Sequence, residues 1–506
     1  MDANSKRIAK NTLYLYLRML VMMFVTLYTA RVVLDKLGVV DYGIYNVIGG
    51  ITVFLGFFSS AFTNATQRFL TVALGRHDVN EGNLVFNQHL LIYIVICVLL
   101  SVIGEAVGPW FIIHKMTIPA DRLSAALIVF HLSIFVLCVT LLGIVFNSAI
   151  IAHEDMKIFS FVSIVDAILK LFIAYALVMV KSDMLVVYAT LMAVEVLIIQ
   201  GCYAFYCRKK YSECRFRWCW DKHLLKKTFN FIGWNTVGTA EAALNDQGIG
   251  ILVNMFFGPV VNAARGITSQ VSGAVYRFST NFLISVQPQM VKSYVNNDQI
   301  YLNNILFYSS RYSFYLLWIF VCPLIFCIDR VLELWLVEVP EWTSIFIRWS
   351  LCSSLFSILA KPIWFIVIAT GNLRKFTLYK TSVSFLIFPV VYIVLLYGAS
   401  PDWVYVCFFI ANLITTSLQI FLLRFYIDFS FNNYAREVLY PILKVTILSY
   451  ILCVPSHLFI IKTLSFDPLY SLFLIEPCVL LIIWFTGMSD IERHQVLNFI
   501  RAKLRK

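Results

Sequence analysis

Long apolar runs recur along the whole chain, and they limit what it can fold into more than any other feature. A helix needs about 20 apolar residues to cross the hydrocarbon core of a bilayer. Fourteen such runs can be read, at 11–34, 44–68, 86–112, 123–150, 158–180, 184–206, 230–257, 262–290, 304–328, 344–369, 376–398, 403–426, 441–461 and 468–487. With 60% hydrophobic and 13% charged residues, the composition also departs from that of a soluble globule. The sequence therefore predicts an all-α integral membrane protein with about 14 transmembrane helices.

Lysine and arginine residues are unevenly divided between the predicted loops. If the N-terminus is cytoplasmic, most of them fall on that side, including the block "RKKYSECRFRWCWDKHLLKK" at 208–227. Positively charged loops stay cytoplasmic, so we expect both termini in the cytoplasm. The net charge of +12 then reflects topology, and the expected partners are anionic lipids of the cytoplasmic face rather than nucleic acid.

The stretch "QRFLTVALGRHDVNEGN" at 67–83 has an echo in "QPQMVKSYVNNDQIYLN" at 287–303. A gapless alignment with an offset of 220 pairs Gln67 with Gln287, Asp78 with Asp298, Asn83 with Asn303, and Gly38 with Gly258. A chance alignment of apolar sequence is the alternative. A true repeat of six helices would give two lobes related by a pseudo-two-fold axis along the membrane normal, as in two-lobed transporters.

The expected domains follow from this repeat. They are an N-terminal lobe at 1–206, a basic amphipathic linker at 207–229, a C-terminal lobe at 230–426, and two further helices with a cytoplasmic tail at 427–506. We expect the linker to lie on the inner leaflet.

Polar and ionisable residues inside the predicted helices are the candidate site residues, because charge in hydrocarbon is costly and faces a cavity or a partner. The candidates for substrate binding are cationic or carry amides: Arg18, Arg31, Lys170, Arg265, Gln270, Arg277 and Asn281. The candidates for ion coupling are acidic: Asp166, Glu241 and Asp246.

One predicted helix carries a stripe of polar and small residues. Gly266, Gln270, Gly273, Arg277 and Asn281 recur at three- and four-residue spacing, which places them on one helix face. Such a stripe serves close helix packing or lines a hydrated cavity. We favour the cavity, because an arginine near mid-membrane, Arg277, is hard to face toward lipid.

For three of the cationic candidates, a position at the lipid headgroups is the alternative to substrate binding. Arg18, Arg31 and Arg265 lie near helix ends and can snorkel to the headgroups. No role is assigned to Glu195 or His131, which are single polar residues in apolar runs.

The acidic candidates also have alternatives. Asp166 and Lys170 are four residues apart and are expected to form an internal salt bridge. Glu241 and Asp246 either bind H⁺ or Na⁺, or pair with arginines of the following helix. The twelve cysteines are scattered without ligand spacing, so no metal site is expected.

The opening "NTLYLYLRMLVMMFVTLYTARVVLDKLGVVDYGIYNVIGG", the "TQRF" at 66–69 and the "VQPQ" at 286–289 resemble the Wzx-type oligosaccharide flippases. These form the polysaccharide-transporter branch of the multidrug/oligosaccharidyl-lipid/polysaccharide (MOP) exporter superfamily. The resemblance implies two six-helix lobes plus two helices in a bacterial inner membrane. It also implies an essential arginine in the first helix, where Arg18 stands.

What such proteins do follows from the same resemblance. They move undecaprenyl-diphosphate-linked oligosaccharide to the periplasmic leaflet for O-antigen and lipopolysaccharide assembly, beside other polysaccharide-assembly membrane proteins. The forked donors of arginine suit a diphosphate. No cofactor is expected, and the residues allow coupling to H⁺, Na⁺ or the membrane potential.

Other functional classes fit less well. The sequence has no phosphate-binding loop, no G-x-S-x-G nucleophile motif and no loop long enough for a soluble catalytic domain. We therefore expect no enzyme, and a membrane-embedded glycan polymerase is the least favoured reading. The closer alternatives are an ion-coupled multidrug antiporter and a lipid II flippase.

Overall fold

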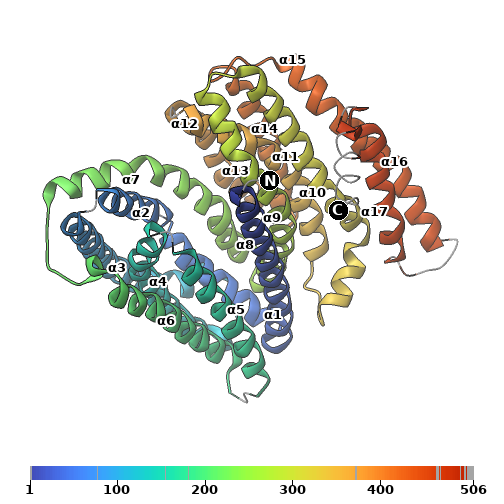
Figure 1. Ribbon diagram of the computed structural model, residues 1–506. Helices are drawn as coiled ribbons and strands as arrows, with labels where there is room; N and C mark the ends of the chain where they lie inside the picture. Colours follow the sequence, from blue (N-terminus) through green and yellow to red (C-terminus); the bar gives the residue numbers. More distant parts are fainter. Residues whose placement is uncertain are drawn as a thin grey trace. The chain divides into compact units, whose positions relative to one another are not determined.

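Helices make up the structure (Figure 1). The computed structural model describes residues 3–494 and 497, apart from 58, 77, 154, 180–181, 371–372, 463–466, 468 and 491; side chains are described from Met22 onward, with gaps inside several helices. These residues form helices and no strand. Ten described helical segments are long and apolar enough to cross a membrane. The chain is therefore an all-helical, multi-pass membrane protein, as predicted.

The difference between fourteen predicted runs and ten long apolar segments has physical causes. The first two runs share one segment, because the helix resumes directly after a kink at Gly38. The runs at 230–257 and 262–290 form helices that are too polar to be among the ten. The last run is interrupted, and its described apolar helix, Ile475–Gly487, is short.

The first six predicted runs form one series of helices. Their bounds are α1 Ala3–Leu55, α2 Ser59–Gly75, α3 Val79–Lys115, α4 Leu123–Ala152, α5 Met156–Met179 and α6 Met184–Lys210. The first run corresponds to the part of α1 before the kink at Gly38. The second run corresponds to the part of α1 after this kink, together with α2.

The second series begins after the basic connection. Its bounds are α7 Lys222–Ala243, a π-helical turn Leu244–Gly248, α8 Ile249–Phe257, α9 Pro259–Val295, α10 Gln299–Trp335, α11 Thr343–Thr370, α12 Leu373–Phe385, α13 Ile387–Leu396 and α14 Trp403–Leu423. The last part of the chain holds α15 Phe431–Tyr434, a π-helical turn Ala435–Leu439, α16 Tyr440–Lys462, α17 Tyr470–Ile482 and a π-helical turn Ile483–Gly487. We call α1–α6 the first repeat and α7–α14 the second repeat.

Helix bounds support a true repeat. Helices α3 and α10 are both 37 residues long and begin at residues 79 and 299, an offset of 220. Helices α4 and α11 begin at residues 123 and 343, again 220 apart. A chance alignment of apolar sequence would not reproduce these starts.

The two paired glycines form the same sharp turn. Gly38 has φ 76° and ψ 168°, and Gly258 has φ 80° and ψ −170°. This backbone region is open almost only to glycine. Each glycine therefore ends one membrane crossing and starts the next.

The echo in the sequence marks a shared device at the start of α3 and α10. Asp78 caps α3 by accepting from the backbone N–H groups of residues 80 and 81, and Asp298 accepts from that of Tyr301. The Asn83 amide donates to the Glu213 carbonyl at 2.8 Å, and the Asn303 amide donates to the Asp428 carbonyl at 2.8 Å. Each repeat thus ties the connection after its sixth crossing to its third.

By contacts, the chain divides into two compact units. Unit 1 contains 1–267, 336–341 and 388–401, and unit 2 contains 268–335, 342–387 and 402–506. Within unit 1, α7 packs against α2, and α8 packs against α1. The division into lobes by repeat, with bounds at 206, 230 and 426, stays a prediction.

Candidate functional site

Unit 1 contains a cavity of about 410 Å³ between α1, α4, α6 and the π-helical turn after α7. Most of its wall is apolar. The polar side chains that line it are Tyr45, Asn46, Thr52, Ser133, Thr140 and Gln247. Such a hollow with a few placed polar groups is the usual form of a ligand site.

Glycines on α1 and α9 leave room for two polar side chains at this cavity. A Cβ atom added to Gly50 would lie 2.8 Å from the Gln247 side-chain oxygen. A Cβ atom added to Gly266 would lie 3.0 Å from the Asn46 amide. The π-helical turn displaces one residue from the regular helix, a distortion often found at functional sites. These glycines therefore let the Gln247 and Asn46 side chains reach the cavity.

Charged side chains gather beside the cavity, on α5 and α6. Asp166 and Lys170 form the predicted salt bridge, with 2.7 Å between carboxylate and ammonium. The Glu195 carboxyl is buried and lies close to the Asp166 carboxyl. Two carboxyl groups in contact can share one proton. The cluster can therefore hold or release a proton next to a cavity wall that contains Tyr45 and Val196.

Glu195 is a residue that sequence reasoning left without a role. Its signal was present, because a lone carboxyl in an apolar run is costly unless it has a partner. The sequence did not reveal that partner, because Asp166 lies on a different helix.

A second cationic residue of unit 1 is also paired. Arg265 donates to the Asp246 carboxylate at 2.8 Å and to the Asp246 carbonyl. The Arg265 side chain is 13% exposed, whereas that of Asp246 is 64% exposed. This pairing is one of the two readings that the sequence left open, and it neutralises the charge of Arg265.

The remaining candidates differ in their surroundings. Glu241 is buried and accepts from the Asn245 amide at 2.9 Å. Arg31 on α1 and Arg277 on α9 are exposed, and neither forms an ion pair with any described residue. Gln270 and Asn281 are half-buried on α9. Arg18 belongs to α1, but its side chain lies outside the described residues.

Arg122, which the sequence did not single out, joins three helices of unit 1. Its guanidinium donates to Asp41 on α1 at 2.7 Å and to Asp183, which caps α6, at 2.9 Å. The hydrogen bond from Arg122 lowers the pKa of Asp183. This bridge holds α1, the start of α4 and the start of α6 together at one end of the bundle. Among the described residues, no cluster could hold a metal ion.

Comparison with known proteins gives structural matches only. No protein-family model and no curated protein matches the sequence. The lipid II flippase MurJ in an inward closed conformation has a TM-score of 0.68 and 14% identity, covering 95% of this chain and 98% of that one. An inward-facing multidrug resistance transporter of the MATE family and MOP superfamily has a TM-score of 0.65 and 12% identity, covering 79% and 94%.

An outward-facing MATE transporter also matches, with a TM-score of 0.58 and 13% identity over 82% of this chain and 94% of that one. At identities this low, the structural likeness establishes the fold alone, and the activity has to be argued from the residues. The chain therefore has the fold shared by MATE transporters of the MOP superfamily and by the lipid II flippase MurJ.

Proposed function

We propose that the chain is a flippase that moves polyprenyl-diphosphate-linked oligosaccharide from the cytoplasmic to the periplasmic leaflet of a bacterial inner membrane, with both termini cytoplasmic. One observation carries the choice within the shared fold. MurJ covers 95% of this chain, whereas the inward-facing MATE transporter covers 79%. MurJ thus matches more of this chain than the MATE transporter does, including a part for which the MATE transporter has no counterpart.

Arg277 is the cation best suited to bind a diphosphate. Lys170 and Arg265 each face a carboxylate, so their charges are already balanced. Arg277 is exposed and has no such partner among the described residues. The guanidinium of such an arginine can donate two parallel hydrogen bonds to phosphate oxygens. Arg18 and Arg31 are the further candidates on α1.

The driving step is assigned to the carboxyl pair of α5 and α6. Asp166 and Glu195 lie close together, and Lys170 forms an ion pair with Asp166. Uptake or loss of one proton would change the charge of this cluster by one unit beside the cavity. The observation favours H⁺ as the coupling ion.

The test uses purified protein in proteoliposomes with a fluorescent polyprenyl-diphosphate oligosaccharide, whose leaflet is read by a membrane-impermeant quencher. We expect Arg277→Ala to lower the transfer rate about 10-fold to 100-fold, because a charge-assisted contact contributes about 1.5–3 kcal/mol. Arg277→Lys should retain part of the rate. Lys292→Ala, on the same helix and also exposed, is the matched control. Unchanged transfer by Arg277→Ala would remove Arg277 from the site.

A multidrug antiporter is the second candidate, since MATE transporters share the fold and the Asp166–Glu195 pair can also bind a cation. In the same vesicles, efflux of a cationic dye driven by a proton gradient, without transfer of the lipid, would favour it. A lipid II flippase predicts faster transfer of lipid II than of the oligosaccharide lipid.

A further inference from the structure

The connection between α6 and α7 contains an extended segment with three exposed aromatic side chains. We call residues 215–220, Arg215 to Trp220, the aromatic ribbon. In extended backbone, alternate side chains point to opposite sides. Phe216, Trp218 and Trp220 share one side and are 56%, 76% and 54% exposed. Of the other three residues, Arg215 and Arg217 are exposed, and the Cys219 thiol contacts the Leu84 carbonyl.

Buried amide side chains of α3 hold this ribbon in place. Asn87 donates to the Arg215 carbonyl at 2.9 Å and accepts from the Arg217 N–H at 2.9 Å. Asn83 donates to the Arg215 carbonyl at 2.8 Å, and Gln88 donates to the Asp221 carbonyl at 2.6 Å. Asn87 and Gln88 are fully buried. Because these bonds run to the backbone, they fix the path of the ribbon and leave its aromatic side chains facing outward.

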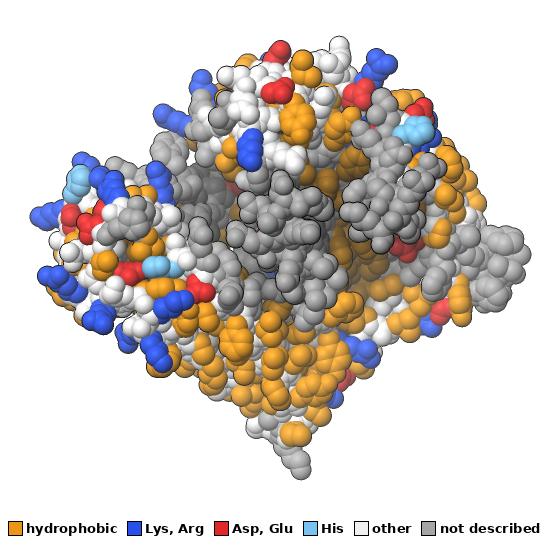
Figure 2. Space-filling model, viewed as in Figure 1, with side chains coloured by type: hydrophobic (Ala, Val, Ile, Leu, Met, Phe, Trp, Pro, Cys, Tyr) orange, Lys and Arg blue, Asp and Glu red, His pale blue; other side chains and the backbone are white. Residues whose placement is uncertain are grey.

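The ribbon lies next to the membrane boundary. Helix α6, one of the candidate spans, ends at Lys210, and the ribbon starts five residues later at Arg215. Exposed basic side chains surround it in the sequence: Arg208, Lys209, Lys210, Lys222, Lys226 and Lys227. Figure 2 shows Lys and Arg side chains gathered at the end of unit 1 that contains this connection. Large apolar groups exposed beside positive charge match an anionic lipid surface.

We propose that the aromatic ribbon is a preformed membrane-interface anchor that binds anionic phospholipid. Phe216, Trp218 and Trp220 enter the headgroup region, where amphipathic aromatic rings are favoured. Arg215 and Arg217 pair with lipid phosphates. The anchor sets the depth at which α6 ends and α7 begins, and it is independent of the transported substrate.

The test compares quenching of ribbon tryptophan fluorescence in nanodiscs of phosphatidylcholine with and without phosphatidylglycerol. The chain has 11 tryptophans, so the ribbon signal is the difference between the wild type and Trp218→Phe/Trp220→Phe. We expect lipid brominated near the carbonyl end of its chains to quench this difference signal, and iodide to leave it largely unquenched. Phosphatidylglycerol should increase the lipid quenching.

Two variants test whether the ribbon binds anionic lipid in the conformation that α3 holds. Arg215→Gln/Arg217→Gln changes only exposed side chains and should remove the effect of phosphatidylglycerol. Asn87→Ala should lower lipid quenching at least twofold and raise iodide quenching, although both tryptophans remain. If iodide quenches the wild-type signal and brominated lipid does not, the ribbon faces water and the proposal fails. If neither quencher reaches the signal, a protein covers the ribbon, and the proposal fails as well.

Discussion

The two repeats use the same face of their third crossing for different purposes. In the first repeat, α3 uses Asn83, Asn87 and Gln88 to hold the aromatic ribbon. In the second repeat, α10 keeps only the asparagine at 303, which holds the Asp428 carbonyl. Further along, Leu91 and Arg311 are 220 positions apart and both 5% exposed. One repeat buries a leucine where the other buries a cation.

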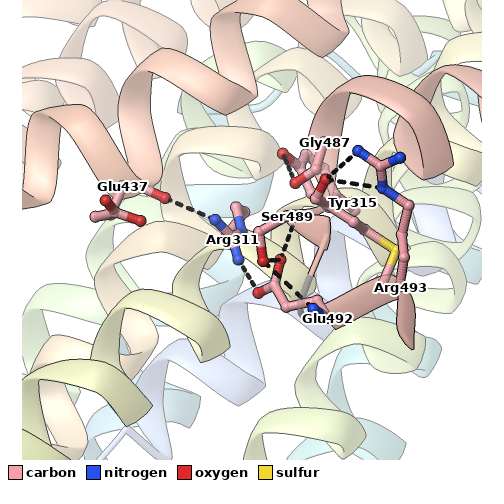
Figure 3. A network of polar contacts seen from close by, with 8 residues as sticks. Arg311, Tyr315, Glu437, Gly487, Ser489, Glu492 and Arg493 are labelled. Atoms are coloured by element: carbon pink, nitrogen blue, oxygen red, sulfur yellow. Dashed lines mark hydrogen bonds and ion pairs between the residues drawn. The ribbon is translucent and has the colours of Figure 1, made fainter. Parts of the chain in front are cut away.

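The buried arginine is explained by the helices that follow the second repeat. Arg311 forms an ion pair with Glu492 and donates to the Glu437 carbonyl at 3.1 Å (Figure 3). Glu492 also accepts from the Ser489 backbone N–H at 2.7 Å, and Tyr315 donates to the Gly487 carbonyl at 3.1 Å. Within unit 2, α10 has thus become the attachment point for the C-terminal helices, whereas α3 in unit 1 serves the connection to α7.

The repeats also differ in charge. The first repeat carries Asp166, Lys170 and Glu195 inside α5 and α6. In the second repeat, residues 381–396 and helix α14 contain no acidic or basic residue. The helices of the second repeat that correspond to α5 and α6 therefore have no counterpart of this charged cluster.

The largest effect on stability is expected from breaking the buried pair of the second repeat. Arg311→Met would leave the Glu492 carboxylate buried and should cost about 3–5 kcal/mol, seen as a large fall in Tm in detergent. Leu91→Met, at the paired position, conserves volume and should cost less than about 1.5 kcal/mol. Equal losses in both variants would mean that α10 does not hold the C-terminal helices through this charge.

The two glycine turns should respond alike. Gly38→Ala and Gly258→Ala each force a side chain into a strained backbone region and should cost about 1–3 kcal/mol. Thermal unfolding measures both. Gly273→Ala, a helical position with open space around it, is the control and should be close to neutral. A loss at only one of the two turns would contradict their equivalence.

The asparagine clamps should differ by a smaller amount. Asn83 donates two hydrogen bonds to the connection after α6, whereas Asn303 donates one to the connection after α14. At about 1 kcal/mol for each bond, Asn83→Ala should destabilise more than Asn303→Ala. Hydrogen exchange of the two connections, with the Asn→Asp variants alongside, measures the difference. A reversed order would show that the second clamp is the stronger one.

The smallest expected effect is on the stability of the fold at acidic pH. Hydrogen bonds from Lys210 and then Tyr206 lower the pKa of Asp155, between α4 and α5. A lowered pKa stabilises the fold above the ordinary carboxyl pKa, and this contribution is lost as pH falls through the lowered value, below about 4. The corresponding turn of the second repeat, "GNLRK" at 371–375, has no acid.

Asp155→Asn should therefore reduce Tm slightly at neutral pH. It should also make the decrease of Tm with decreasing pH less steep below a pH of about 4. Lys210→Gln, which removes the main donor, should shift that fall to higher pH. If Asp155→Asn leaves the acid profile of the wild type unchanged, this carboxyl does not contribute to it.

Much of the fold could be predicted because its signals are local. The helix runs, the paired glycines and the aspartate caps each depend on a few neighbouring residues, and the salt bridge of Asp166 and Lys170 depends on helix spacing. The site was less accessible. Glu195 and Arg122 acquire their meaning from side chains on other helices, and nothing in their own neighbourhoods names those partners.

The sequence by itself determined that the chain is a membrane protein and predicted a repeat of six helices, because apolar length and a 220-residue offset are properties of the chain alone. Only the tertiary structure decided which charges are available. It paired Arg265 with Asp246 and Arg311 with Glu492, and it left Arg277 without an ion pair among the described residues. The physical reason is that the cost of a buried charge depends on what lies within a few ångströms of it, and those neighbours come from distant parts of the chain.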